Sequence, residues 1–360
     1  MGNSVKEKIH RKRIVSIAER LGEHFEVTST SSTSVHLSEV NGSEPPCPVV
    51  TWVLRFLFLS VGLYLVVPVV RCFKRFKRVK RIGLRMTTEQ ESEAFYCKAL
   101  ELVKEAGTIV RKAIGKGKNV ETKTDFSDLV TESDKEVEKL IIGKLREEFP
   151  NHRFIGEESV AAGLKCELTA EPTWIIDPID GTMNFVHGFP VVAVSVALAV
   201  DKKVVLGIVY NPILDRMYTA RKGRGSFCNG DKLHVSGNMD ISKALIVSEV
   251  GSSREPTRIE FAFRNMQRIT QKAHGLRCMG SAALNMCFVA AGEADAYYEF
   301  GIHCWDIAAA ALVVTEAGGV VMDTEGGPLN LMNRRVICAS SRALADAVSQ
   351  TIEHVQLESD

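Results

Sequence analysis

The segment from residue 174 to residue 185, Trp-Ile-Ile-Asp-Pro-Ile-Asp-Gly-Thr-Met-Asn-Phe, constrains this chain more than any other. Its apolar start predicts a buried strand that ends at Asp177, because short apolar runs bounded by turn-forming residues are typical of buried strands. Pro178 and Gly181 then favour a turn. We expect this turn to return Asp180 to the side of Asp177, so that two carboxylates meet at one point.

Two buried carboxylates repel each other unless they share a proton or bind a cation. Carboxylate and carbonyl oxygens are hard ligands that suit Mg2+ better than zinc. The Ile179 carbonyl oxygen is a further candidate ligand, because it lies in a turn beside Pro178, which has no N–H group. The backbone N–H groups of Gly181 and Thr182 follow, and they predict a phosphate site if a helix begins there.

Two more acidic groups lie far from this segment in the sequence. Glu157 and Glu158 follow the short run 154–156, and Asp306 stands at the start of an Ala-rich helix predicted over 306–317. Each group alone is typical of an ordinary turn or helix cap. Together with the aspartates of the central segment, they are candidate metal ligands.

Helices and strands interleave along the chain from residue 87, which predicts a layered α/β fold. Apolar residues at helical spacing predict helices over 95–113, 131–149, 306–317 and from 342 onward, and Thr131 to Asp134 resembles a capping box at the start of the second. Short β-branched runs predict strands over 174–176, 191–200, 204–210, 245–250, 320–322 and 336–339. With 45% apolar and 25% charged residues, the chain can bury a large core.

Residues 1–86 differ from the rest of the chain in charge. They hold 15 Lys and Arg against 6 Glu (+9), which leaves 30 basic against 38 acidic residues (−8) for the remainder. An apolar stretch over 48–70 precedes a basic flank over 71–85. This pattern predicts membrane contact through residues 48–85, by insertion or surface binding, with the downstream domain in the cytosol. The alternative is a variant extension without a catalytic role.

Two other compositional features carry predictions. The Ser- and Thr-rich run 28–34 predicts disorder. The nine cysteines are scattered without any C-x-x-C pair, which predicts free thiols in a reducing compartment. We expect no nucleic-acid partner, because the basic flank follows an apolar run and the acidic remainder has no recognisable base-reading motif.

Three strings together carry a family resemblance. They are Gly-Glu-Glu at 156–158, Trp-Ile-Ile-Asp-Pro-Ile-Asp-Gly-Thr-x-Asn-Phe-Val-His at 174–187, and Trp-Asp at 305–306 with Glu-Ala-Gly-Gly at 316–319. Over residues 87–355 the chain resembles the inositol monophosphatase family, Mg2+-dependent and lithium-sensitive phosphatases that share a fold with fructose bisphosphatase. The resemblance implies an α/β (α+β) layered sandwich with alternating helix and sheet layers. We divide the chain into the extension 1–86, an N-terminal metal-binding part 87–235 and a C-terminal part 236–360.

The resemblance also implies a set of metal ligands. Glu157, Asp177 and the Ile179 carbonyl would hold one Mg2+. Asp177, Asp180 and Asp306 would hold a second, and a third, weaker ion would lie near Glu157. The site would therefore take two to three Mg2+ ions.

Catalysis in such a site needs no side-chain nucleophile, because two cations that clamp the attacking and leaving oxygens also activate water. The resemblance implies that Thr182, supported by Asp134, orients this water, with Glu157 as the third catalytic residue. We assign no catalytic role to His187 or His303.

Substrate contacts follow from the same resemblance. The implied set is Asp180, Gly181, Thr182, Ser252, Gly280, Ser281, Ala282, Glu299 and Asp306. Within it, Asp180 and Glu299 would accept hydrogen bonds from inositol hydroxyls, and the amides of Gly181 and Thr182 would neutralise phosphate charge. Glu255 stands where the family pattern has Thr, and Lys123 is expected to help close the site.

The resulting hypothesis is Mg2+-dependent hydrolysis of inositol monophosphates to inositol and phosphate by a cytoplasmic homodimer. One alternative is another small phosphomonoester substrate within the same fold. A bisphosphate substrate would require extra basic residues near the pocket, and the sequence shows only scattered Lys and Arg. A second alternative is a membrane-tethered scaffold without activity, which predicts the loss of at least one metal ligand.

Overall fold

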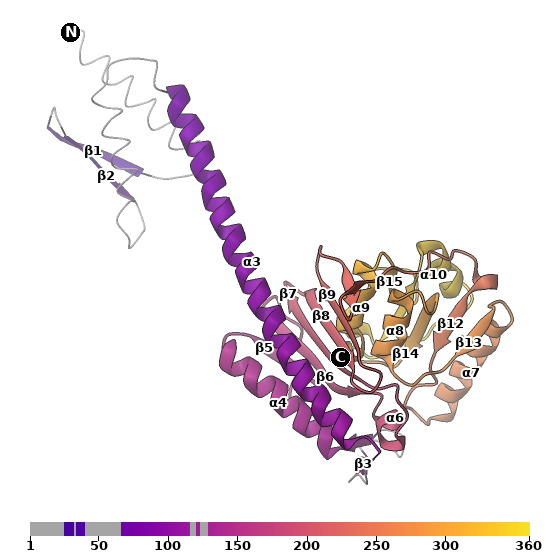
Figure 1. Ribbon diagram of the computed structural model, residues 1–360. Helices are drawn as coiled ribbons and strands as arrows, with labels where there is room; N and C mark the ends of the chain where they lie inside the picture. The colour runs from indigo at the N-terminus through magenta and orange to yellow at the C-terminus, as the bar shows by residue number, and fades with distance from the viewer. Residues whose placement is uncertain (1–24, 32–33, 40–65, 116–119, 123–128) are drawn as a thin grey trace. The chain divides into compact units, whose positions relative to one another are not determined.

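The computed structural model describes the backbone of residues 25–31, 34–39, 66–115, 120–122 and 129–360, and the side chains of 89–115 and 131–360. Two compact units divide the chain, Met1–Glu89 and Gln90–Asp360. Figure 1 shows the elements of both. Each unit is described by itself, and the sequence-based boundaries at 86/87 and 235/236 stay predictions.

The first unit contains an antiparallel strand pair, β1 (Phe25–Ser31) and β2 (Ser34–Glu39). Disorder was therefore the wrong expectation for the run 28–34 at its strand residues, where the β-branched Thr28 and Thr30 favour extended backbone. Helix α3 (Val66–Ala113) begins well before the predicted start at 95, because its basic flank is rich in Arg and Lys, which are good helix formers.

No helix in the described part of the chain combines the length and the apolar character that crossing a bilayer requires. Residues 48–65 of the apolar stretch lie outside the described residues. Lys123, predicted to help close the site, also lies outside them.

In the second unit, the remaining helices are α4 (Glu132–Glu148), α5 (Glu157–Ala161), α6 (Thr182–His187), α7 (Pro256–Thr270), α8 (Ala282–Ala290), α9 (Cys304–Glu316) and α10 (Arg342–Ser349). A short hairpin pairs β3 (Val120–Thr122) with β4 (Leu129–Thr131). Seven strands form one sheet in the order β11-β10-β9-β8-β7-β6-β5, and five form a mixed sheet in the order β13-β12-β14-β16-β15.

The strands of the larger sheet are β5 (Arg153–Gly156), β6 (Thr173–Asp180), β7 (Ala193–Val200), β8 (Lys203–Asn211), β9 (Arg216–Arg221), β10 (Ser226–Cys228) and β11 (Asp231–Lys232). Those of the smaller sheet are β12 (Leu245–Ser248), β13 (Gly275–Arg277), β14 (Ala296–Phe300), β15 (Val320–Met322) and β16 (Arg335–Ala339). Every strand predicted from the sequence is present, so these predictions are confirmed.

Layers of helix and sheet alternate in the second unit, and three apolar cores hold them together (Figure 1). The first core joins α3 and α4 to one face of the large sheet. The second lies between the two sheets and encloses α8 and α9. The third joins the outer face of the small sheet to α7 and α10. This arrangement confirms the predicted layered sandwich.

The alternation of side chains along β6 connects the first two cores. Trp174 and Ile176 belong to the core under α3 and α4, whereas Ile175 belongs to the core between the sheets. Such alternation follows from the two-residue period of a strand. Both faces are buried, so the strand is apolar until it reaches Asp177.

Candidate active site

A β-bulge in β6 brings Asp177 and Asp180 to the same face of the large sheet. Asp177 pairs with Ser195 and Asp180 with Ala193, so Pro178 and Ile179 together face one residue of β7. In a regular strand, residues three apart point to opposite faces, and the extra residue of a bulge reverses this. Ile179 packs into the core under α3 and α4, as Ile176 does. The predicted convergence of the two aspartates therefore has a definite backbone cause.

Asp306 completes a cluster of three carboxylates. One oxygen each from Asp177, Asp180 and Asp306 lies within 4.8 Å of the others. Asp177 and Asp180 are buried, with 2% and 6% of their surface exposed. The structure thus brings together residues that are up to 129 positions apart in the sequence, because α9 packs against β6.

The start of α8 holds Asp180 in place. Its carboxylate accepts hydrogen bonds from the Ser281 hydroxyl, from Ala283 N at 2.9 Å and from Ala282 N at 3.2 Å. These donors are the first backbone N–H groups of the helix, which have no partner within it. Ser281 and Ala282 therefore lie at the site, as predicted, and they orient a carboxylate directly.

Asp306 occupies the third position of α9 and not its start, so the predicted helix began two residues too late. His303 precedes the helix, and its N–H donates to Asp306 Oδ2 at 2.6 Å. In this capping box, the Asp306 side chain in the first turn accepts from the backbone of the residue before the helix. The sequence pattern around Asp306 did not indicate such a box. The cap fixes the Asp306 side chain at the helix end nearest to β6.

Burial and mutual repulsion oppose ionisation of the cluster. Burial, with the negative charges of Glu157, Asp180 and Asp306, raises the pKa of Asp177 well above its ordinary value. Burial and the charge of Asp306 raise the pKa of Asp180 to about 8. Burial likewise raises the pKa of Asp306 to about 6. A cation between these groups would favour their ionised forms.

The donor set fits a divalent cation. Asp177 Oδ1 is buried and has no hydrogen-bond partner within the described part of the chain. An unpaired buried carboxylate oxygen is costly unless a cation balances it. Three carboxylates at this spacing are hard oxygen donors of the kind that bind Mg2+. The residues present therefore match a metal site.

Glu157 lies beside the cluster without joining the group within 4.8 Å. It is the first residue of α5, directly after β5, and it lines the same cavity. Behind it, the buried Glu138 accepts hydrogen bonds from Glu158 N at 2.8 Å and from Ser159 N at 2.9 Å. Sequence reasoning missed Glu138, although it stands four residues after Asp134 on the helix that packs here.

Thr182 and Asp134 are in contact, as predicted. The Thr182 hydroxyl lies 3.4 Å from Asp134 Oδ1 and 3.1 Å from the Ile179 carbonyl oxygen. Asp134 is fully buried and forms the predicted capping box of α4 with Thr131, whose N–H donates to Asp134 Oδ2 at 2.9 Å. A carboxylate that helps to start a helix is thereby aimed at the turn after β6.

The turn itself depends on Gly181. Its backbone has a φ of 88°, in the left-handed region. A Cβ atom there would lie 2.9 Å from the carbonyl oxygens of both Gly280 and Val191. Asn184 secures the same junction, because its side-chain amide donates to Val191 O and Met279 O at 2.8 Å each. Asn184 belongs to the central sequence segment, but its role was not predicted.

A cavity of about 940 Å³ opens over these residues. Ten of the predicted site residues line it: Glu157, Asp180, Gly181, Thr182, Ser252, Gly280, Ser281, Ala282, Glu299 and Asp306. Asp177, Asp134 and Ile179 lie behind this wall. Glu299, on β14, is 93% buried because only 7% of its surface is exposed, and it accepts a hydrogen bond from the Tyr297 hydroxyl.

Glu249 is a site residue that sequence reasoning missed. It follows β12 directly and lines the cavity. It accepts hydrogen bonds from Met279 N at 2.7 Å, Gly280 N at 2.8 Å and Asn285 Nδ2 at 2.8 Å. A carboxylate at the end of a short apolar strand was the available signal, as it was for Asp177.

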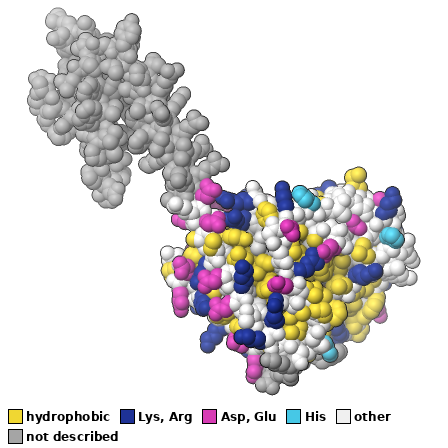
Figure 2. Space-filling view, in the orientation of Figure 1, with side chains coloured by type: hydrophobic (Ala, Val, Ile, Leu, Met, Phe, Trp, Pro, Cys, Tyr) yellow, Lys and Arg dark blue, Asp and Glu magenta, His cyan; other side chains and the backbone are white. Residues whose placement is uncertain are grey.

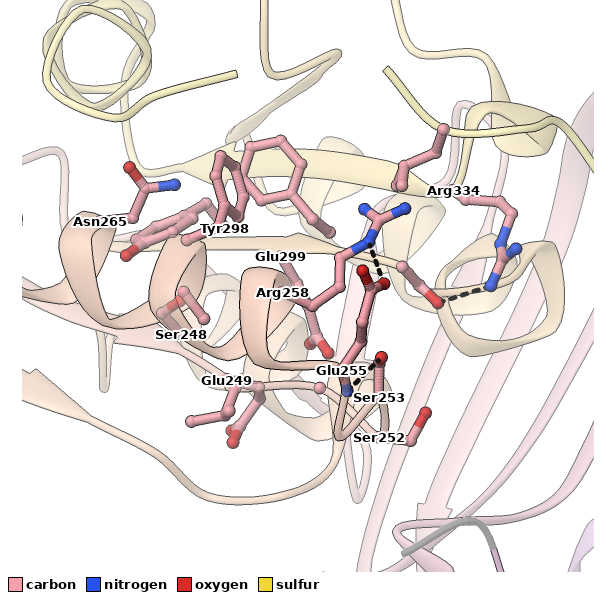
Figure 3. A pocket seen from close by; sticks show the side chains of 17 residues that line it. Ser248, Glu249, Ser252, Ser253, Glu255, Arg258, Asn265, Tyr298, Glu299 and Arg334 are labelled. Atoms are coloured by element: carbon pink, nitrogen blue, oxygen red, sulfur yellow. Dashed lines mark hydrogen bonds and ion pairs between the residues drawn. The ribbon is translucent and has the colours of Figure 1, made fainter. Parts of the chain in front are cut away.

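Figure 3 shows a smaller cavity of about 280 Å³. It adjoins the first, since Glu249, Ser252 and Glu299 line both. Glu255 lies at its wall, with Oε2 4.0 Å from Nε of Arg258. Arg254 lines the larger cavity. The sequence showed only scattered Lys and Arg, and the fold places two of these arginines at the cavities, Arg254 in the loop after β12 and Arg258 on α7 (Pro256–Thr270).

The two histidines that received no catalytic role lie at helix ends. His187 is the last residue of α6. His303 precedes α9 and stacks on Trp305, with ring centroids 4.5 Å apart, and its Nδ1 lies 2.6 Å from Asp360 Oδ1. Neither histidine belongs to the group of three carboxylates.

Comparisons with known proteins agree with this geometry. The model of the inositol monophosphatase family matches residues 91–357. Inositol monophosphatase 1 of Bos taurus is 54% identical over 263 residues, covering 73% of this chain and 95% of that protein. Inositol monophosphatase 2 of Homo sapiens is 53% identical over 263 residues, covering 73% of this chain and 91% of that protein.

Solved structures show the same likeness. The IMPase TM1415 of Thermotoga maritima superimposes with a TM-score of 0.63 at 34% identity, covering 70% of this chain and 93% of that one. The inositol monophosphatase from Anabaena has a TM-score of 0.61 at 29% identity, covering 72% and 95%. On its sequence match, its fold and the acidic cluster at its centre, this chain belongs to the inositol monophosphatase family.

Proposed function

We propose that the chain is a phosphatase that hydrolyses inositol monophosphates to free inositol and inorganic phosphate. One observation carries the proposal: three carboxylates converge within 4.8 Å beside the Thr182–Asp134 pair, at the floor of an open cavity. The curated relatives named inositol monophosphatase support the substrate class.

We further propose Mg2+ as the cofactor. Asp177, Asp180, Asp306, Glu157 and the Ile179 carbonyl would hold two to three ions. When bound there, these ions supply the positive charge that phosphoryl transfer requires. Inhibition by Li+ belongs to the same proposal.

The chain's own residues orient the attacking water. The buried Asp134 carboxylate accepts a hydrogen bond from the Thr182 hydroxyl, which leaves a lone pair of the Thr182 oxygen facing outward. A water in the cavity can donate to this oxygen and thereby aim its own lone pair at phosphorus. The N–H groups of Gly181 and Thr182 are placed to donate to phosphate oxygens.

Buried acceptors would select the polyol. Asp180 and Glu299 line the cavity with little exposed surface, so an inositol hydroxyl that donates to either replaces lost water. An analogue without that hydroxyl leaves one acceptor position of a buried carboxylate unfilled, which is costly. Gly280, Ser281, Ala282 and Ser252 complete the wall.

The test is phosphate release by the full chain from inositol 1-phosphate, with and without Mg2+, alongside nucleotide and sugar phosphates. The proposal expects selective, Mg2+-dependent release that Li+ inhibits. Release from a different panel member alone would keep the phosphatase site and discard inositol as substrate. No release from any member would favour a scaffold without activity.

Asp177→Asn provides the sharpest variant for this assay. We expect turnover to fall by at least roughly a hundredfold, because loss of a ligand exceeds the effect of losing an outer-shell partner. The fold should persist, since a neutral amide relieves repulsion in the metal-free cluster. Circular dichroism and thermal unfolding check the fold. A variant with ordinary Mg2+-dependent activity would remove Asp177 from the metal site.

A homodimer is the assembly we propose. The face of the second unit seen in Figure 2 has a broad area of hydrophobic side chains among scattered charges. Contiguous apolar surface of this kind is typical of an interaction site. Sedimentation equilibrium should give twice the chain mass of 39.6 kDa; a single-chain mass at micromolar concentration would reject the dimer.

Membrane contact through residues 48–85 is a separate proposal, with the phosphatase unit on the cytoplasmic side. The basic flank 71–85 supports it, because Lys and Arg next to apolar residues favour anionic lipid surfaces. Flotation with vesicles containing phosphatidylserine should recover the full chain, and a chain beginning at Met86 should stay behind. Equal behaviour of both chains would favour a variant extension.

A further inference from the structure

Two thiols and a carboxylate meet at the start of α9. They form a group separate from the three carboxylates of the candidate active site. Cys304 is the first residue of α9, and Cys166 lies in the connection between α5 and β6. Their sulfur atoms are 3.8 Å apart. A carboxylate oxygen of Asp360, from the segment after α10, lies within 4.8 Å of both sulfurs.

The spacing of the sulfurs matches a tetrahedral thiolate site. Two sulfurs that are each about 2.3 Å from one zinc ion, at a tetrahedral angle, lie about 3.8 Å from each other. A disulfide would instead require an approach to about 2.05 Å, with a change in side-chain torsions. The observed separation therefore needs no closure to accept a cation.

The carboxylate is already oriented toward the thiols. Its Oδ2 accepts a hydrogen bond from Cys304 N at 3.0 Å, and its Oδ1 lies 2.6 Å from His303 Nδ1. Only 4% of the Asp360 side chain is exposed. Hydrogen bonds of this kind fix ligating carboxylates in metal sites, and each oxygen keeps a lone pair for a ligand.

Charge in this group is balanced by a divalent ion. Two thiolates and one carboxylate carry three negative charges, and the guanidinium of Arg334 lies 3.7 Å from Asp360 Oδ1. A divalent cation brings the total to zero. Binding displaces one proton from each thiol, so two protons are released to solvent for each ion bound.

We propose that Cys166, Cys304 and Asp360 form a binding site for a thiophilic divalent cation such as Zn2+, with water as the fourth ligand. The bound ion links three segments that are far apart in the sequence: the connection after α5, the start of α9 and the C-terminal segment. Because the donors stand at binding distance already, occupancy stabilises this arrangement without moving α9.

The site differs in chemistry from the carboxylate cluster. Sulfur ligands favour Zn2+, whereas the all-oxygen cluster of Asp177, Asp180 and Asp306 suits Mg2+. The proposal therefore stands whether or not the chain hydrolyses inositol monophosphates, and its test is a binding measurement.

The probe is Co2+, which reports sulfur ligation by a charge-transfer absorption in the near ultraviolet. Reduced full chain in saturating Mg2+ is titrated with Co2+, and the bound Co2+ is then displaced with Zn2+. We compare wild type with Cys166→Ser, with Asp360→Asn and with Cys97→Ser as control, since Cys97 is an exposed thiol elsewhere. Zn2+-induced shifts of the unfolding temperature are measured on the same four proteins.

Wild type and Cys97→Ser should show the charge-transfer band and a rise in unfolding temperature with Zn2+. Cys166→Ser should bind roughly tenfold or more weakly, with the band reduced, and Asp360→Asn should keep the band at lower affinity. The proposal fails if wild type shows no band, or if Cys166→Ser matches wild type. It also fails if the two thiols are recovered as a disulfide and the protein binds no Co2+ even after this disulfide is reduced.

Discussion

At the scale of single residues, His152 shows how burial sets a protonation state. The ring lies half-buried among Phe95, Phe149 and Trp174, and its Nδ1 accepts a hydrogen bond from Trp174 Nε1 at 3.0 Å. An acceptor nitrogen carries no proton, so the structure selects the neutral imidazole. Burial lowers the pKa of His152 below its ordinary value of 6.5.

This shift predicts a loss of stability in mild acid. The unfolded chain binds a proton at His152 below about pH 6.5, whereas the folded chain resists it until the pH falls further. The stability that the neutral His152 ring contributes is therefore complete above about pH 6.5. It is lost as the pH falls from there through the lower pKa of the folded chain. Urea unfolding at pH 8 and pH 5.5 should show a smaller drop for His152→Asn than for wild type. The difference should be less than about 1 kcal/mol, given the partial exposure of the ring.

Asparagine is the matched replacement, because its carbonyl oxygen can still accept from Trp174 and does not titrate. Equal drops in the two proteins would mean that His152 is protonated equally in the folded and unfolded states.

At the scale of elements, the turn between β6 and α6 predicts a strict requirement for glycine. In Gly181→Ala, a left-handed alanine costs about 1–2 kcal/mol, and contact with two carbonyl oxygens adds to it. We expect a loss of roughly 2 kcal/mol or more in the free energy of unfolding. Gly223→Ala is the control, because Gly223 has a φ of 74° and nothing within 4 Å of its Cβ position. Equal losses would mean that the turn relaxes.

The contact between α4 and the start of α5 predicts a positioning role for Glu138. Its carboxylate accepts from Glu158 N, Ser159 N and the Ser159 hydroxyl. The amide of Glu138→Gln would set an NH2 group against one of these donors. We expect the Mg2+ concentration for half-maximal activity to rise roughly tenfold, with the saturated rate retained. Glu136→Gln, exposed on the same helix, should leave the requirement unchanged; a fall in the saturated rate alone would contradict the role.

The sequence could predict those elements whose signals are local. The strand predicted to end at Asp177 and the capping box of Thr131 and Asp134 depend on neighbours within a few positions. The capping box is confirmed, whereas the strand is present but continues through the bulge to Asp180, so its predicted end was wrong. The contacts of Ser281 with Asp180 and of Glu249 with Gly280 join residues 101 and 31 positions apart. Pairing at such separations is decided by how the layers pack, which no local pattern encodes.

At the scale of the whole molecule, the three cores predict independence from the N-terminal segment. The earliest described residue that contributes to any core is Phe95. A chain that begins at Met86 should therefore unfold within about 3 °C of the full chain, since shifts of this size correspond to about 1 kcal/mol in a domain of this class. Calorimetry of both chains checks this. A much lower transition would show that residues 1–85 stabilise the phosphatase unit.

The interleaving of helices and strands predicted the layered architecture at this scale, and the three strings that carry the family resemblance implied its alternating helix and sheet layers. They did not reach the segment before residue 87, where the helix from Val66 and the strand pair β1 and β2 have no counterpart in the resemblance. Charge and hydropathy describe that segment only by composition, and composition does not determine pairing.

The bulge in β6 decides which spacing of Asp177 and Asp180 can serve the site. A regular strand puts residues two apart on one face, so deleting Pro178 or Ile179 would leave Asp180 on the face of Asp177 and would make the bulge unnecessary. With both residues present, straightening the strand would instead turn Asp180 toward the apolar layer under α3 and α4. Along an evolutionary lineage, a three-nucleotide deletion here would thus keep both carboxylates on one face, whereas a change that removes the bulge would lose a ligand while leaving every acidic residue in the gene.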